Sequence, residues 1–274
     1  MAKTKLLIVT HEMSPFLELT KISEITRQLP QAMQEKGFEI RILMPRFGNI
    51  NERRNRLHEV IRLSGMNIMI DDNDNPLIIK VASIPAARMQ VYFLDNEDYF
   101  QRKHVFRDKE SKFYADNDER TIFFCKGALE TVKKLGWAPD IVHCHGWMTS
   151  LVPVYIKTSY KNDPTFKNSK VVYSVYESCF TETLNEDLHK KAVMNNMTAE
   201  DTKVFENPTS STLHIGAITY SDAVVLADEN IEDNVLKFVK DSNKPTLAFN
   251  LTENFENFYS LYEEISSEEL VSIA

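Results

Sequence analysis

The chain has 274 residues, of which 43% are hydrophobic and 26% are charged, and its formal net charge at pH 7 is -8. This length can bury a substantial core, and the composition excludes a fibrous or disordered protein. The acidic balance repels phosphate backbones and anionic lipids, so nucleic-acid binding and membrane-surface binding are disfavoured as the main activity.

The cysteines and the N-terminal segment indicate a cellular compartment. Cys125, Cys144 and Cys179 are an odd number, are widely spaced and form no C-x-x-C pair, which favours a reducing environment. The first apolar run meets His11 and Glu12 after only a few residues. That run is too short for a signal peptide, and no stretch approaches the roughly 18 apolar residues of a membrane span. We therefore expect a cytoplasmic protein with no membrane segment.

The chain begins with a predicted strand, a loop without glycine and an amphipathic helix. The strand covers residues 5–10, and Thr20 can cap the helix that follows the loop. The apolar positions of this helix recur at spacings of three and four: Ile22, Ile25, Leu29 and Met33. Gly37 ends the pattern, and a second strand covers residues 39–44. This order predicts parallel strands with a right-handed crossover.

The next segment changes character and predicts a small β insertion at about residues 64–95. Short strands are expected at 66–70, 77–83 and 89–94, with a charged turn at 71–76 between the first two. Strands joined by such short turns pair antiparallel. We therefore expect an antiparallel insertion rather than another parallel unit.

Parallel order then resumes. A long amphipathic helix ends at Gly136. The strands expected after it are 140–144, 171–176, 222–226 and 246–249, and the helices are 147–157, 213–220, 230–240 and about 253–267. Parallel strands that alternate with helices predict an α/β fold with one Rossmann-like, doubly wound, mainly parallel sheet. Ligands of such folds bind at the carboxyl ends of the strands.

Five segments of the chain, in order, resemble the motifs of one enzyme family. They read LLIVTHEMSPF with LPQAMQEKGFEIRILMPRFG, VYFLDNEDYFQR, DNDERTIFFCKGALE, APDIVHCHGWMTSLVPVYIK and, more weakly, YSDAVVLADENIEDNV. These segments are similar to the N-terminal catalytic domain of bacterial glycogen and starch synthases, the ADP-glucose-dependent α-1,4-glucosyltransferases. The resemblance covers about residues 5–240. It implies one half of a GT-B glycosyltransferase, with the active site in the cleft between two Rossmann-like domains.

The family's second domain supplies most donor contacts, and this chain ends before it. The final apolar helix reads as the closing element of a domain that covers residues 1–274. This reading favours a stand-alone domain, and a fragment of a longer protein remains open as the alternative.

The opening loop departs from the family pattern K-T-G-G-L-x-D-V. Alignment through the Pro-Phe and Leu-Pro pairs places Glu18 at the lysine that meets the donor phosphates, and Thr20 and Lys21 at the two glycines. The charge that faces phosphate is thereby reversed, and two side chains obstruct the approach of the backbone to a ligand. Lys21 either restores part of the positive charge or is a solvated surface lysine.

The segment HCHGW departs from the family's H-x-H-D-W at Gly146, which replaces aspartate. His143 and His145 are two residues apart on a strand and point to the same side, so they could share a metal ion. No Cys, Asp or Glu lies beside them as a third ligand, and we expect no metal. We expect one histidine to pack at the strand end and the other to line the cleft.

The segment VVYSVYESCF occupies the place of the family's T-I-H-N-x-x-Y-Q-G, whose histidine lies near the transferred glucose. Here Tyr176 replaces that histidine and Glu177 replaces the asparagine. A tyrosine with an ordinary pKa near 10 cannot take the role of an imidazole at neutral pH. A new Tyr-Glu acid-base pair is disfavoured because adjacent strand residues face opposite sides. No residue is therefore assigned a catalytic role.

Three functions remain open from the sequence. The first is a catalytically degenerate synthase domain, a pseudoenzyme that acts as a binding or regulatory module and contacts α-glucan or maltooligosaccharide. The second is a synthase half that transfers glucose together with a separately encoded donor domain. The third binds another phosphorylated metabolite through Lys21, Arg46 and Arg102. No cofactor is expected.

The aligned site residues follow the ends of predicted parallel strands or the opening loop. We expect them to gather at the carboxyl edge of the sheet. They are Glu18, Lys21, His145, Gly146, Tyr176 and Glu177.

Overall fold

A computed structural model of the chain describes residues 3–84, 87, 89–250 and 255–271. Within this part the strands form a ten-stranded sheet with the order β10-β9-β8-β7-β1-β2-β6-β5-β3, and β4 pairs with β5. The strands are β1 (Lys5–Thr10), β2 (Glu39–Pro45), β3 (His58–Glu59), β4 (Met66–Ile70), β5 (Asn73–Ile84), β6 (Met89–Asp95), β7 (Ile141–His145), β8 (Lys170–Val175), β9 (Ala223–Leu226) and β10 (Thr246–Ala248).

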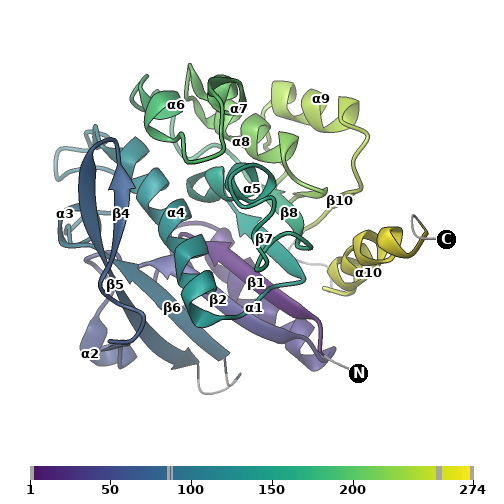
Figure 1. Cartoon of the computed structure of the whole chain (residues 1–274), viewed down its shortest axis with the longest axis horizontal. Helices are drawn as coiled ribbons and strands as arrows, with labels where there is room; N and C mark the ends of the chain where they lie inside the picture. Colours follow the sequence, from purple (N-terminus) through teal and green to yellow (C-terminus); the bar gives the residue numbers. More distant parts are fainter. Residues whose placement is uncertain (1–2, 85–86, 88, 251–254, 272–274) are drawn as a thin grey trace.

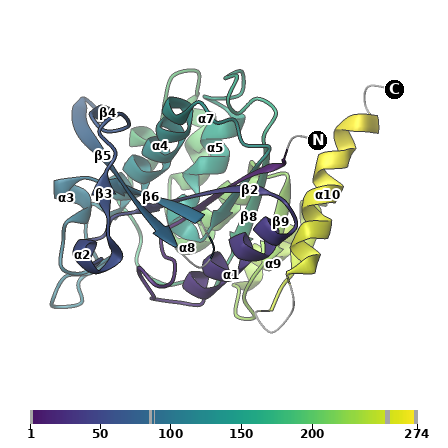
Figure 2. The same ribbon diagram turned by 90° about the horizontal axis from the view of Figure 1, so that it is seen from below.

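Helices cover both faces of the sheet (Figures 1 and 2). They are α1 (Ile22–Glu35), α2 (Glu52–Asn55), α3 (Glu97–Phe100), α4 (Asn117–Leu135), α5 (Leu151–Lys157), α6 (Leu188–Lys191), α7 (Ala199–Thr202), α8 (Ser210–Thr219), α9 (Asp233–Asp241) and α10 (Glu256–Val271). Helices α4, α5 and α8 pack together on one face, whereas α1 and α10 lie on the other. None of the helices in the described ranges is both long enough and apolar enough to cross a membrane.

The predicted parallel sheet is confirmed. Strands β10, β9, β8, β7, β1, β2 and β6 are joined by parallel pairings throughout. Strand β1 lies between β2 and β7, with Leu7 opposite both Arg41 and Val142. The chain first builds outward from β1 through β2 and β6, and then returns to build outward on the other side from β7. The sheet therefore has its switch point at the carboxyl ends of β1 and β7.

The β insertion is narrower than the sequence predicted. Strand β6 belongs to the main sheet, because it pairs parallel with β2 and places Val91 opposite Ile42. Its segment Val91–Asp95 is buried on both faces, as expected of a central parallel strand. Strands β3 and β4 pair antiparallel with β5, with Met66 of β4 opposite Leu77, and β5 pairs antiparallel with β6, which joins the insertion to the parallel sheet.

Helix α10 closes the fold. The predicted apolar face is confirmed at four positions, where Phe258, Leu261, Tyr262 and Ile265 are buried. The helix begins at Glu256, and the first residues of the predicted range lie outside the described part of the chain. The hydroxyl of Tyr262 lies 2.6 Å from Nδ1 of His143 in β7. A buried polar contact thus joins the last helix to the centre of the sheet.

This contact makes a testable contribution to stability. We expect Tyr262→Phe to lower the free energy of unfolding by about 1–3 kcal/mol, because it leaves a buried imidazole nitrogen without its partner. The matched control is Tyr259→Phe on the same helix, where the ring is only partly buried. Urea unfolding followed by circular dichroism measures both variants, and equal losses in the two would contradict the assigned contact.

Candidate functional site

A cavity of about 500 Å³ opens beyond the carboxyl ends of the central strands. His11 follows β1, Trp147 follows β7, and Cys179 and Phe180 follow β8, and all four line the cavity. Thr20 contributes from the opening loop. The cavity therefore lies at the switch point of the sheet, where open α/β folds bind their ligands.

Aromatic side chains make one wall of this cavity. Phe106 packs against both His11 and Trp147, with ring centroids 5.6 and 5.0 Å apart. Phe180 contacts Trp147 on one side and stacks on Phe113 on the other. Polar side chains complete the lining: Asn49, Lys103, His104, Arg107, Asp108 and Ser111. The cavity thus combines apolar ring faces with hydrogen-bonding groups.

Glu12 fixes the opening loop through three hydrogen bonds. Its buried carboxylate accepts hydrogen bonds from the backbone amides of Leu19 and Thr20, at 2.6 and 2.8 Å, and from the hydroxyl of Thr20 at 2.5 Å. Burial acts to raise the pKa of Glu12, but His11 and Thr20 hold it below its usual value. Two backbone donors that precede α1 are therefore satisfied within the chain.

Lys21, in the same loop, forms an ion pair with Asp228. Its ammonium lies 2.8 Å from Asp228, which follows β9 and whose side chain is only 4% exposed. The backbone amides of Glu177 and Asn230 also donate to Asp228. Burial acts to raise the pKa of Asp228, and these donors lower it below its usual value. The start of α1 and the ends of β8 and β9 are thereby joined at one carboxylate.

Glu18 does not share this wall. Its carboxylate accepts a hydrogen bond from the hydroxyl of Ser14 at 2.6 Å, and it lines a separate depression with Glu24 and Arg27 of α1. The hydroxyl oxygen of Thr20 accepts a hydrogen bond from the amide of Ile22 at 3.2 Å, but the N-cap residue of α1 is Lys21, one position later than predicted. The loop therefore divides its side chains between two surfaces.

Tyr176 and His145 are bonded to each other inside the protein. The hydroxyl of Tyr176 lies 2.8 Å from Nδ1 of His145, and the two residues are 3% and 0% exposed. Burial, together with the neighbouring His11, lowers the pKa of His145 to about 3. Burial also raises the pKa of Tyr176 well above its usual value. Both side chains are therefore neutral at pH 7, and neither lines the cavity.

His143 is buried as well. Its Nδ1 contacts Tyr262 and its Nε2 lies 2.7 Å from the hydroxyl of Ser174. His143 packs against Phe258 and Tyr262 of α10. Both histidines, His143 and His145, are fully buried and neither lines the cavity, contrary to the expectation that one of them lines the cleft. Their rings lie 4.0 Å apart, but the described residues contain no group of three His, Cys, Asp or Glu side chains placed to hold a metal ion.

Gly146 has a backbone conformation that excludes the family's aspartate. Its φ of 77° and ψ of 170° belong to a region that is essentially restricted to glycine. A Cβ atom at this position would lie 2.9 Å from Cε1 of His11 and 3.0 Å from Cδ1 of Ile22. The turn after β7 therefore depends on the absence of a side chain.

The three cations proposed for a phosphorylated metabolite all have acidic partners. Besides Lys21 with Asp228, Arg102 forms a two-pronged pair with Asp116, and Arg46 pairs with Glu52. None of the three lines the cavity. The structure therefore gives no support to a phosphate site built from them.

Comparison with known proteins identifies the family. Residues 5–243 match the family described as the starch synthase catalytic domain. The chain belongs to this family. It is 39% identical over 211 residues to the glycogen synthase of Chlorobium luteolum, which covers 70% of this chain and 42% of the relative. It is 43% identical over 173 residues to the glycogen synthase of Chlorobaculum tepidum, which covers 63% of this chain and 36% of the relative.

The fold is that of a solved member of the same family. The catalytic domain of starch synthase IV from Arabidopsis thaliana, bound to ADP and acarbose, matches with a TM-score of 0.74 and 16% identity. The match covers 91% of this chain and 52% of the solved one. The fold is therefore that of one GT-B half, as the sequence predicted. The chain spans about two fifths of the length of the curated relatives it matches.

Two site residues were not found from the sequence. Glu12 stands in the matched motif EMSPF but received no role, and Asp228 lies in the weakest of the five matching segments. The sequence signal available at both positions was an acidic residue two positions after a predicted parallel strand. The structure shows that both carboxylates are buried.

Substitution of Gly146 tests the backbone of the site. We expect Gly146→Ala to lower the free energy of unfolding by about 2 kcal/mol or more, through backbone strain and the collision with His11. The control is Gly65→Ala, because Gly65 also has a positive φ but no atom within 4 Å of the added Cβ. If the two variants lose the same stability in urea unfolding, the collision does not occur.

The buried state of His145 predicts a pH dependence of stability. The folded pKa of about 3 lies below the ordinary histidine pKa of about 6.5, so the unfolded chain binds more protons between these values. Stability should therefore fall as the pH drops below about 6.5. In His145→Asn the slope between pH 6 and pH 5 should decrease by up to about 1.4 kcal/mol per pH unit. Urea unfolding at each pH gives the slopes, and an unchanged slope would show that His145 is protonated in the folded protein.

Proposed function

We propose that this starch-synthase-family domain is a catalytically degenerate module that binds α-glucan in the cavity at the strand ends. The observation that carries the proposal is the buried bond between Tyr176 and His145. Tyr176 aligns with the histidine that the resemblance places near the transferred glucose, yet its hydroxyl is directed to His145 and away from the cavity. No side chain at that position is then available to contact a reacting sugar.

The opening loop supports the same proposal. The residue aligned with the donor-binding lysine is Glu18, which is turned toward Ser14. Lys21, in the same loop, has its charge paired with Asp228. A donor phosphate would meet an acidic loop whose amides at Leu19 and Thr20 are already bonded to Glu12. Binding of ADP-glucose would therefore have to break existing charged hydrogen bonds, each worth a few kcal/mol.

The cavity has the properties that an oligosaccharide requires. Its volume of about 500 Å³ lies in the range of small-molecule sites. Phe106 and Phe113 are only partly buried, so their faces can cover the apolar side of a sugar ring. Asn49, Asp108 and Ser111 supply groups for the sugar hydroxyls. A maltooligosaccharide is therefore the ligand class we propose.

A second candidate is an α-1,4-glucan synthase half that transfers glucose from ADP-glucose together with a separately encoded donor domain. The observation in its favour is the 39–43% identity to proteins named glycogen synthase. In that case the donor domain would have to provide every contact to the nucleotide. For both candidates we propose a cytoplasmic location, which is supported by three cysteines that are all free thiols.

Calorimetric titration distinguishes the two candidates. We expect maltoheptaose to bind saturably and ADP-glucose to give no saturable heat. Phe113→Ala should weaken maltoheptaose binding about tenfold, because a stacked ring contributes about 1 kcal/mol or more. Ile61→Ala is the control, since Ile61 is 83% exposed and lies outside the cavity.

The outcomes that contradict the proposal are equally specific. Saturable binding of ADP-glucose would favour the synthase half. Absence of maltoheptaose binding, or equal binding by Phe113→Ala and the unmodified protein, would exclude the cavity as the glucan site.

A further inference from the structure

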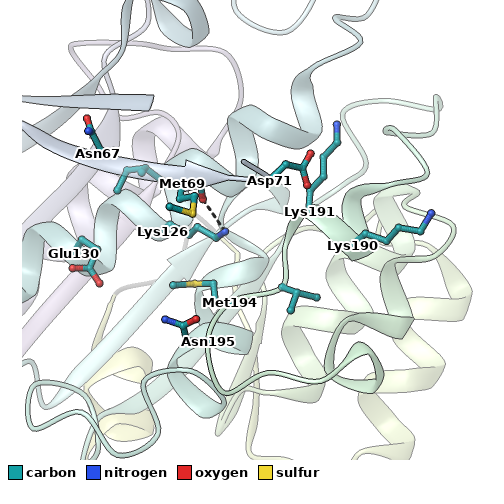
Figure 3. Close-up of a pocket in the computed structure, with 11 residues that line it drawn as sticks. Asn67, Met69, Asp71, Lys126, Glu130, Lys190, Lys191, Met194 and Asn195 are labelled. Atoms are coloured by element: carbon teal, nitrogen blue, oxygen red, sulfur yellow. Dashed lines mark hydrogen bonds between the residues drawn. The ribbon is translucent and has the colours of Figure 1, made fainter. Parts of the chain in front are cut away.

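A second cavity has a volume of about 470 Å³ (Figure 3). Its walls come from three places: strand β4 and the turn after it, the middle of α4, and the segment that follows the start of α6. It shares no lining residue with the cavity at the strand ends. The proposed glucan site therefore does not account for it.

A buried ammonium group is directed into this second cavity. Lys126 projects from α4 and is only 6% exposed. Its Nζ donates one hydrogen bond, to the backbone carbonyl of Met69 at 3.1 Å, and points toward the open space between β4 and Met194 (Figure 3). Among the described residues no carboxylate forms an ion pair with it. An ammonium has three donors, so two of them remain for a ligand.

Burial of the Lys126 ammonium disfavours its charged form. Burial lowers the pKa of Lys126 to about 8, and the more distant Asp71 offsets only part of that effect. A buried charge without a full partner is costly, and an anion that enters the cavity would remove that cost.

The other charged groups around the cavity are largely paired elsewhere. Lys191 of α6 is held by Asp118 and Glu119. Lys190 pairs with Asp187, and Glu130 of α4 accepts hydrogen bonds from Tyr160 and Lys133. Asp71, in the turn after β4, carries a further negative charge. Among the described lining residues, Lys126 and Asp71 therefore remain without a direct ion-pair partner.

The rest of the lining is apolar and accessible. Met69 is 61% exposed and Val193 is 37% exposed, and Met194, which is partly buried, also lines the cavity. Large apolar side chains that remain open to solvent beside a cavity indicate a ligand with an apolar body. Asn67 and Asn195 add polar groups at the rim.

We propose that this cavity binds a small organic monocarboxylate, with the carboxylate on Lys126 and the apolar body against Met69, Val193 and Met194. A monoanion fits better than a phosphate dianion, because Asp71 and Glu130 repel additional negative charge. The site is a second binding site of the domain and is independent of glucan binding.

Calorimetry of the full chain with hexanoate as the probe tests this site. At pH 7 hexanoate should bind saturably, whereas the neutral isostere hexanamide should bind at least about tenfold more weakly and inorganic phosphate should not bind. Lys126→Met keeps the length of the side chain but removes the charge, and it should abolish hexanoate binding. The control is Lys134→Met on the same helix, because Lys134 bonds to Ser64 outside the cavity and should leave binding unchanged.

The pH dependence supplies an independent readout. Since the ammonium loses its proton above about pH 8, hexanoate affinity should fall about tenfold between pH 7 and pH 9. Lys126→Met should melt at the same or a higher temperature than the unmodified protein, which shows that it folds. The proposal is overturned if hexanoate does not bind, if hexanamide or phosphate binds as tightly, or if Lys126→Met binds hexanoate like Lys134→Met.

Discussion

The buried hydrogen bond between Tyr176 and His145 is the contact on which this account of the domain depends. It joins the ends of β7 and β8 directly beneath the switch point of the sheet. Alongside it, His143 bridges Ser174 of β8 and Tyr262 of α10. Two histidines that stand at one strand end thereby become neutral, packed groups. The position to which the resemblance assigns a sugar contact is, in this chain, part of the interior.

Two acidic side chains, Glu12 and Asp228, form hydrogen bonds at the same edge of the sheet. Glu12 binds the amides of the opening loop, and Asp228 gathers Lys21 and the amide of Glu177. The Glu12 bonds lie within the loop after β1, whereas the Asp228 bonds join the segments that follow β9, β1 and β8. The reversal of charge at Glu18 costs the fold nothing, because that side chain faces solvent. The proposed loss of donor recognition is therefore compatible with retention of the fold.

The parallel sheet could be predicted from the sequence because continuous apolar runs such as Ile141–Cys144 mark strands buried on both faces. The parallel pairing of β6 with β2 could not be predicted, since alternating apolar residues and turn signals do not show which neighbour a strand pairs with. The position of His143 and His145 on one face followed from strand periodicity. The packing of Tyr262 against His143 could not be predicted, because the two residues are 119 positions apart in the sequence. Asp228, likewise, is brought to Lys21 only by the completed sheet.

The central claim is that His145 and Tyr176 are occupied with each other and do not meet a ligand. Nitrogen-15 NMR of the imidazole rings tests it most directly, since the shifts of Nδ1 and Nε2 report the protonation state and hydrogen bonding of each histidine. We predict that His145 stays neutral from about pH 8 down to about pH 5 and that ADP-glucose leaves its shifts unchanged. A His145 ring that titrates near its ordinary pKa, or whose shifts move when ADP-glucose is added, would contradict the account.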